Sequence, residues 1–315
     1  MIHAWVLGSR GLLGSAISRQ LDRQNVNIYH VTESPFNWRN IEILRIQFRF
    51  ALAKFIDCLT PNDQWEIYWA AGVGAMGSKA EDLHSETIAL EEFLMLLQEK
   101  ISDLSSPGLI GFASSAGAIY SSCVDFEITE LSTETAQSDY AFAKLTQEKI
   151  LRRFLLGKRN ISLLVARFST LYGPGQSSGK QQGLLSHIAR CALKHQPVQI
   201  FVPLDTLRDY MFSDDAALTF VRSLRLLRAD DCKFRMKIIS SERSVTIAEI
   251  ISTFNRLMQK RVPLVFNRNN LSTLYAPRIS YRSIYSTKND IRQHTLTEGI
   301  ASLILSERAA YINIS

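Results

Sequence analysis

Residues 6–17, VLGSRGLLGSAI, decide the fold of this 315-residue chain. The stretch follows an apolar run and carries Gly8, Gly11 and Gly14 before a segment whose apolar residues recur at helical spacing. A strand, a glycine turn and a helix in this order form the start of a β-α-β unit, in which small residues let the backbone approach a pyrophosphate. Free amides at the helix N-terminus also attract an anion. The turn therefore predicts a nucleotide-binding site, although its G-x-x-G-x-x-G spacing is one residue longer in the first gap than the usual fingerprint.

The bulk composition is that of an ordinary globular protein, with 46% hydrophobic and 21% charged residues. No run approaches the roughly 18 apolar residues of a membrane span, and the first ten residues resemble a core strand more than a signal peptide. The four cysteines are scattered, which favours reduced thiols in a cytoplasmic protein and predicts no metal site. The net charge of +6 suits an anionic small molecule and is only weak support for nucleic-acid binding.

Strands and helices alternate along the first half of the chain. The predicted strands lie in segments 2–7, 26–31, 65–72, 108–117 and 161–175, and the predicted helices in 15–24, 86–101 and 140–155. This alternation predicts an α/β fold with a doubly wound, parallel sheet of the Rossmann type.

The alternation weakens after residue 172, and the stretch 36–60 is ambiguous between strand and helix, with mostly helix favoured. We expect a dinucleotide-binding domain over 1–172 and a smaller α/β substrate-binding lobe over 173–315. Some segments of the second part are expected to return to the first. Ser213 is predicted to cap a helix over 213–227.

Arg10 lies inside the glycine turn, and the strand end about twenty residues later reads HVTESPF. An acid at that strand end would bind the ribose 2′-hydroxyl of NAD. Here Thr32 occupies the strand end and Glu33 is the acid nearby. An arginine in the turn favours a 2′-phosphate, so NADP is preferred over NAD; a solvated surface arginine is the alternative.

The segment YAFAK places Tyr140 and Lys144 four residues apart on one helix face. An ammonium group beside a phenol favours the phenolate and lowers its pKa. A tyrosine tuned in this way can exchange a proton with a substrate hydroxyl while a hydride passes to nicotinamide.

The chain resembles the extended short-chain dehydrogenases/reductases, in the NAD(P)-dependent nucleotide-sugar epimerase/dehydratase family. The segments GSRGLLG, WAAG, FASSAGAIYS, YAFAK, VARFSTLYGPGQ, LRDYMFSDDAA and SVTIAEII occur in the family's order over residues 2–255. The resemblance implies a Rossmann domain, a lobe that binds a nucleotide-sugar, and Tyr140 as acid/base with Lys144 lowering its pKa. The predicted coenzyme-binding residues are Gly8, Ser9, Arg10, Gly11, Leu12, Leu13, Gly14, Thr32, Ala70, Ala71, Tyr140 and Lys144.

The resemblance also implies a serine that hydrogen-bonds the reacting hydroxyl. Counting from Tyr140 favours Ser115, with Ser114 as the second choice, whereas counting from another tyrosine leads to Ala116. No acid follows these serines in SSAGAIY, so 4,6-dehydration of the sugar is disfavoured.

The resemblance implies that Arg208 binds the diphosphate of the substrate. The alternative is that Arg208 forms an ion pair with Asp209. Thr170 stands where the family often has a substrate-contacting asparagine. Arg167, Asp214 and Asp215 are interpreted as structural residues. His187 is interpreted as a helix-face residue near the cleft.

We therefore expect an enzyme, either an epimerase or a keto-reductase of a nucleotide-diphosphate sugar. The alternative is a non-catalytic NAD(P)-binding sensor or scaffold on the same fold. The resemblance also implies a homodimer that pairs through the helices over 86–101 and 140–155. Neither a nucleic acid nor a membrane is expected as a partner.

Overall fold

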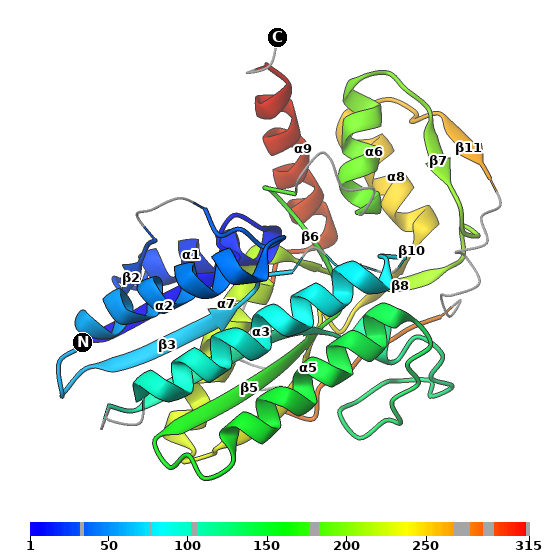
Figure 1. Cartoon of the computed structure of the whole chain (residues 1–315). Helices are drawn as coiled ribbons and strands as arrows, with labels where there is room; N and C mark the ends of the chain where they lie inside the picture. The colour runs from blue at the N-terminus through cyan, green and yellow to red at the C-terminus, as the bar shows by residue number, and fades with distance from the viewer. Residues whose placement is uncertain are drawn as a thin grey trace.

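The computed structural model describes residues 1–31, 35–72, 74–75, 77–101, 106–176, 183–267, 278–285 and 293–312. Its centre is a six-stranded parallel sheet (Figure 1). The strands, in their order across the sheet, are β2 (Asn27–Tyr29), β1 (Ile2–Leu7), β3 (Gln64–Trp69), β4 (Gly108–Ser115), β5 (Ile161–Phe168) and β9 (Phe234–Ile239). The strand order reverses between β1 and β3, and ligands of such sheets bind at this switch point, outside the carboxyl ends of the strands. The predicted Rossmann-type fold is confirmed.

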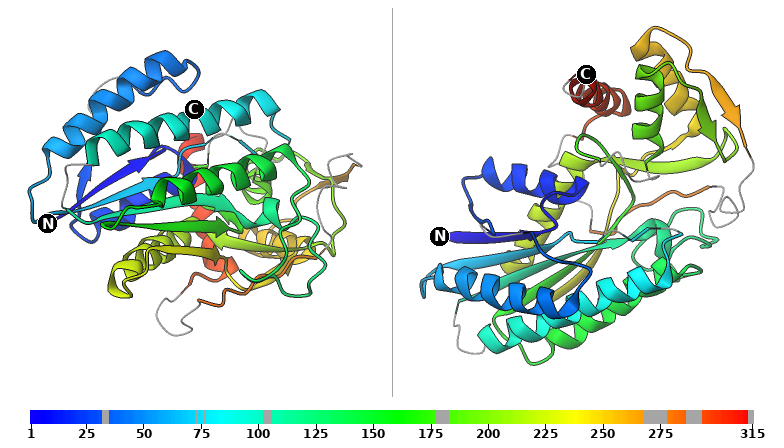
Figure 2. Two further views of the ribbon diagram at one scale, coloured as in Figure 1. Left: turned by 60° about the horizontal axis from the view of Figure 1, so that its bottom comes forward. Right: turned by 45° about the horizontal axis from the view of Figure 1, so that its top comes forward.

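Helices cover both faces of this sheet (Figure 2). Because successive side chains of a strand point to opposite faces, Trp5 packs toward one helical layer and Val6 toward the other. The helices on the Trp5 side are α2 (Ile41–Asp57), α3 (Ala80–Ile101) and α5 (Asp139–Leu155), and those on the Val6 side are α1 (Leu12–Asp22) and α7 (Ser213–Ala229). Burial on both faces explains the nearly continuous apolar strands. The helix favoured for most of the segment 36–60 is confirmed as α2.

The second lobe packs its own apolar core beside the carboxyl ends of the main sheet (Figure 1). It contains a three-stranded sheet in the order β10-β8-β6 and a two-stranded sheet of β11 and β7. Its elements are β6 (Thr170–Tyr172), α6 (Leu184–Leu193), β7 (Val198–Ile200), β8 (Leu207–Phe212), β10 (Ser244–Thr246), α8 (Ile247–Met258), β11 (Leu264–Phe266) and α9 (Leu296–Ile312). None of the helices in the described ranges is long and apolar enough to cross a membrane.

Parts of the chain beyond residue 172 return to the main sheet. The strand β9 pairs with β5, and α7 packs on the same sheet. The segment 278–285 lies along its edge, where the Glu130 carboxylate accepts hydrogen bonds from the Ser283 hydroxyl at 2.5 Å and from the Ile284 amide at 2.8 Å. The two lobes are therefore joined by several crossings of the chain.

The predicted cap at Ser213 is wrong. Phe212 precedes α7 in an extended conformation, and Ser213 is already the first residue of the helix. The Ser213 hydroxyl is buried and has no hydrogen-bond partner among the described residues. The two aspartates that follow hold neighbouring elements, as their structural interpretation implies: Asp214 forms an ion pair with Arg19, and Asp215 accepts a 2.7 Å hydrogen bond from the His294 amide.

Candidate active site

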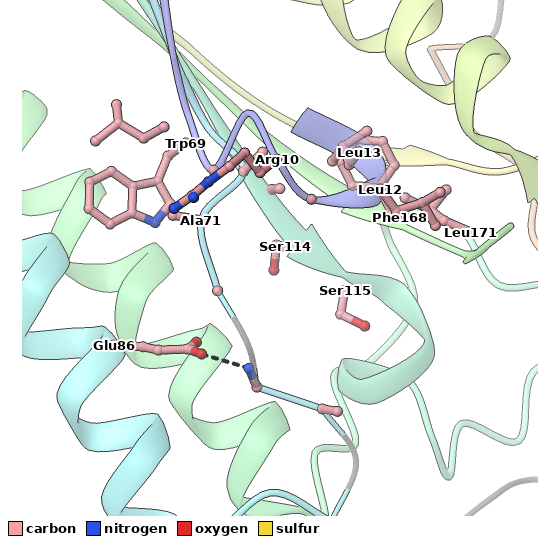
Figure 3. Close-up of a pocket in the computed structure, with 18 of the residues that line it drawn as sticks. Arg10, Leu12, Leu13, Trp69, Ala71, Glu86, Ser114, Ser115, Phe168 and Leu171 are labelled. Carbon is pink, nitrogen blue, oxygen red and sulfur yellow. Dashed lines mark hydrogen bonds between the residues drawn. The ribbon is translucent and has the colours of Figure 1, made fainter. Parts of the chain in front are cut away.

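A groove of about 2270 Å³ runs from the switch point of the main sheet to the second lobe. The glycine turn and the serines at the end of β4 line it together (Figure 3). The residues predicted for dinucleotide binding and those predicted for chemistry on a second ligand thus line one continuous cavity.

Close backbone approach explains two glycines of the turn. Gly8 has φ +88°, and a β-carbon there would lie 2.6 Å from the Ala70 carbonyl carbon. A β-carbon on Gly14 would collide with the Gly8 carbonyl oxygen. Gly11 is the N-cap of α1 and provides no side chain to bind the first amides of the helix, whose first turn also lacks an acid. Helix N-termini with free amides attract anions, and these residues lie at the groove.

Nearly all of the predicted coenzyme residues gather here. The groove is lined by Gly8, Ser9, Arg10, Gly11, Leu12, Leu13, Ala70, Ala71, Tyr140 and Lys144, with Gly14 buried directly beneath the turn. Thr32 and Glu33 lie outside the described residues.

An aromatic wall near Arg10 was missed in the sequence. Trp38, Trp69 and Phe36 all line the groove; the ring centroids of Trp38 and Trp69 are 6.2 Å apart, and those of Trp38 and Phe36 are 5.7 Å apart. The segment FNWR at 36–39 was the available signal, and it also brings Arg39 to the groove lining. The rings meet edge to face, at 88° between Trp38 and Trp69 and 76° between Trp38 and Phe36, and give this part of the groove an apolar, aromatic lining.

The three predicted catalytic residues come together at the end of β4. Ser115 caps the short helix α4 (Ala116–Ile119), where its hydroxyl accepts from the Ala118 amide at 3.3 Å, and it lies near enough to Tyr140 to act on the pKa of the phenol. Tyr140 lies in the first turn of α5, which begins at the Ser138 cap. Lys144 follows one turn later, with its Nζ 5.8 Å from the Tyr140 ring centroid. Local structure therefore places a hydroxyl, a phenol and an ammonium group in one part of the groove.

The two serines of β4 have different partners. The Ser114 hydroxyl donates a 2.6 Å hydrogen bond to Glu148 in the protein interior, whereas the Ser115 hydroxyl accepts from the Ala118 amide at 3.3 Å and lies near Tyr140. Ala116, the third alternative, is buried and carries no polar group. The structure thus places Ser115, rather than Ser114, near the tyrosine in the groove.

The expected lowering of the Tyr140 pKa by Lys144 is wrong for this structure. Burial and the negative charge of Glu86 raise the pKa of Tyr140 to about 12, against a smaller lowering by the Ser115 hydrogen bond. The Lys144 ammonium instead donates to the Ala113 carbonyl at 3.4 Å and to Gln147 Oε1 at 3.2 Å. Burial lowers the pKa of Lys144, while nearby carboxylates oppose that effect. The phenol of Tyr140 is therefore protonated at neutral pH.

At the lobe end of the groove lie two of the predicted substrate residues. Thr170 is exposed at the start of β6, and Arg208 lies on β8; both line the groove. The carboxylate of Asp209, the alternative partner of Arg208, accepts from the Ser241 amide at 2.9 Å and the Ser241 hydroxyl at 2.8 Å. His187 of α6 also lines this end, as its interpretation as a helix-face residue near the cleft implies.

Arg167 is structural, as predicted. Its guanidinium is buried behind β4 and donates from Nε to Glu148 Oε1 at 3.0 Å and from Nη2 to Glu148 Oε2 at 2.7 Å. Nη1 donates to the Tyr120 hydroxyl at 2.6 Å, and Glu134 is a further partner. This network holds β4, β5 and α5 together beneath the predicted catalytic residues. Among the described residues, no cluster of His, Cys, Asp and Glu is placed to hold a metal ion.

The fold and the glycine turn define a dinucleotide-binding protein of the Rossmann class. The model of the NAD dependent epimerase/dehydratase family matches residues 4–237, and the chain belongs to this family. A curated relative, the dTDP-4-dehydro-6-deoxyglucose reductase of Escherichia coli, is 26% identical over 155 residues, which are 49% of this chain and 47% of the relative. The match thus spans about half the length of that relative.

Solved structures similar to this chain cover nearly all of it. MoeE5 in complex with UDP-glucose and NAD superposes with a TM-score of 0.78 at 18% identity, over 98% of this chain and 99% of that one. UDP-glucose 4-epimerase with UDP-glucose from Thermotoga maritima gives a TM-score of 0.77 at 16% identity, with the same coverage. At this level of identity, the likeness establishes the fold.

Proposed function

We propose that the chain is an NADP(H)-dependent enzyme that reduces a keto group of a nucleotide-diphosphate sugar. The observation that carries the proposal is the juxtaposition of Ser115, Tyr140 and Lys144 in the same groove as the glycine turn. The reductase name of the Escherichia coli relative supports this choice of reaction.

The residues of the groove fit a nicotinamide dinucleotide. The close approach at Gly8 and Gly14 and the amides of α1 would hold its pyrophosphate, and Lys144 would hold a ribose hydroxyl. When bound in its reduced form, the coenzyme supplies a hydride to the sugar carbonyl carbon.

Tyr140 supplies the proton for this reduction. Its pKa, raised to about 12, keeps the phenol protonated at neutral pH, so it donates to the carbonyl oxygen as that oxygen gains negative charge. Ser115, which lines the groove near Tyr140, would orient the same oxygen. A hydride on carbon and a proton on oxygen together convert the ketone to an alcohol.

Arg208 would bind the diphosphate of the substrate from across the groove. Its guanidinium lies on β8 at the lobe end, and a planar guanidinium suits the paired oxygens of a phosphate. Two similar structures were determined with UDP-glucose, which supports a nucleotide-sugar as the substrate class.

A second candidate function is 4-epimerisation, favoured by the similar structure of the Thermotoga maritima epimerase. With NAD⁺ held by the same residues, the coenzyme would accept a hydride from one face of a sugar carbon and return it to the opposite face, while Tyr140 takes and returns the hydroxyl proton. An epimerase therefore regenerates its coenzyme, whereas a reductase consumes it.

Coenzyme stoichiometry tests both functions. Purified protein is incubated with NADPH and 4-keto nucleotide-sugars, and separately with NAD⁺ and UDP-glucose, while NADPH absorbance and sugar products are followed. One NADPH consumed for each alcohol formed supports reduction, and sugar interconversion without net absorbance change supports epimerisation. Coenzyme binding with neither reaction would favour a non-catalytic sensor, and no binding of NAD or NADP would contradict the proposal.

The variant Arg10→Ala is expected to weaken NADPH binding by about tenfold or more and NADH binding much less. A charge-assisted hydrogen bond to the 2′-phosphate contributes about 1.5–3 kcal/mol, and Arg10 is the arginine of the glycine turn in the groove. Both dissociation constants are measured by fluorescence titration. Arg49→Ala, an exposed arginine on α2, is the control. Equal losses for the two coenzymes would remove the reason for preferring NADP.

The family resemblance predicts a homodimer through α3 and α5. These helices pack side by side, and each presents an exposed apolar residue, Met95 on α3 and Phe142 on α5. Sedimentation equilibrium of the wild type is expected to give twice the chain mass, and Met95→Lys with Phe142→Lys is expected to give a monomer. A concentration-independent monomeric wild type would contradict this prediction.

A further inference from the structure

Glu86, on the second turn of α3, brings a carboxylate into the groove from outside the predicted catalytic set. Its Oε1 accepts a 2.6 Å hydrogen bond from the Gly74 amide, in the segment that follows β3 (Figure 3). A β-carbon on either Gly72 or Gly74 would lie 3.2 Å from Glu86 Oε2. Glycine at both positions therefore leaves space for the carboxylate against this segment.

The residue after Glu86 connects α3 to the predicted catalytic helix. The buried hydroxyl of Thr87 accepts a 3.2 Å hydrogen bond from Gln147 Nε2. Gln147 in turn accepts, through Oε1, the 3.2 Å hydrogen bond from Lys144 Nζ. This chain of hydrogen bonds fixes the position of α3 at residues 86–87 relative to the ammonium group of Lys144.

We propose that Glu86 is a positioning residue for the reduction: it holds the segment after β3 against the groove and places its carboxylate in the same groove that Tyr140 and Lys144 line. The expected effect of Glu86 on catalysis rests on the proposed function. Its expected effect on the charges of Tyr140 and Lys144 does not, because these residues are in place without coenzyme or substrate.

The charges around the pair agree with this role. The groups that act on Tyr140 are Glu86 of α3 and Ser115 of β4, while Lys144 lies on the same helix as Tyr140. The negative charge of Glu86 raises the pKa of Tyr140. The same charge opposes the lowering of the Lys144 pKa by burial. Glu148 of α5 also acts on Lys144, but it is bound bidentately by Arg167.

The test is Glu86→Gln, which keeps an oxygen for the Gly74 amide and removes the charge. Because a phenol near a negative charge loses its proton less readily, the variant is expected to lose reductase activity at lower pH than the wild type. The alkaline limb of kcat is expected to move down by roughly one pH unit.

A second readout does not depend on turnover. Lysine-selective NMR of the protein without coenzyme is expected to show a lower pKa for Lys144 in Glu86→Gln, since an ammonium group loses a stabilising negative charge. Glu86→Asp, which retains the charge, is expected to restore both readouts toward the wild type. Glu81→Gln, exposed on the first turn of the same helix, is the matched control and leaves both unchanged.

These outcomes separate the two proposals. An unmoved pH limb and an unmoved Lys144 titration in folded Glu86→Gln would overturn the role of Glu86. A wild type without reductase activity would overturn the proposed function, and the Lys144 titration would then still decide whether Glu86 controls the charge of the pair. If Glu86→Gln fails to fold, Glu86→Ala removes the charge in its place: a lowered Lys144 pKa supports the role of the charge, and an unmoved one contradicts it.

Discussion

Replacing Tyr140 by phenylalanine is expected to lower kcat for keto-sugar reduction by about 10²- to 10⁴-fold and to leave the affinity for NADPH nearly unchanged. The variant removes the phenol hydroxyl and retains the ring, half-buried in the groove. Without a proton donor, the negative charge that develops on the carbonyl oxygen is not neutralised in the transition state. Steady-state kinetics and a coenzyme titration measure the two quantities.

Tyr311→Phe, on the exposed end of α9, is the control for the loss of a tyrosine hydroxyl. Undiminished turnover in Tyr140→Phe would contradict the assignment of Tyr140 as acid. Undiminished biological function without turnover, with nicotinamide binding retained, would instead favour the sensor or scaffold alternative.

Replacing Arg167 by methionine is expected to lower the free energy of unfolding by about 3–5 kcal/mol, because removing one partner of a buried ion pair leaves the other charge uncompensated. Arg167 is 1% exposed and Glu148 is 3% exposed. The substitution also removes the 2.6 Å hydrogen bond to the Tyr120 hydroxyl. Urea unfolding followed by circular dichroism measures the change.

Two companion variants identify the cause of this loss. Arg167→Met combined with Glu148→Gln removes the orphaned charge and is expected to recover part of the stability. Lys233→Met breaks an exposed pair with Asp231 and is expected to cost less than about 1 kcal/mol. A loss below about 1 kcal/mol in Arg167→Met itself would show that the network contributes little to stability.

Features that depend on local patterns were predictable from the sequence. The glycine turn, the helix over 140–155 and the spacing of Tyr140 and Lys144 follow from residues close together in the chain. The choice between Ser114 and Ser115 was also within reach, because neighbouring residues of a strand point to opposite sides. In the structure the first serine faces Glu148 and the second faces Tyr140.

Features that depend on packing between distant segments were not predictable. Glu86 reaches the groove only because α3 packs against α5, and its charge is one reason why the pKa of Tyr140 is raised. The sequence shows a lysine four residues from the tyrosine, but not that its ammonium donates to Ala113 and Gln147. Because β8 runs directly into α7, Phe212 takes the N-cap position and Ser213 is already the first helical residue.

The position of β9 in the sheet has a consequence for the chain during its synthesis. β9 pairs with β5, but the chain first builds β6, α6, β7, β8 and α7. As the chain grows on the ribosome, β5 is therefore exposed as an unpaired edge until residue 239 has been added, and such edges invite pairing with other chains. α7, which covers one face of the same sheet, is also made late. The nascent chain thus presents both an open strand edge and an uncovered apolar face, the features that make folding intermediates prone to aggregation and dependent on chaperones.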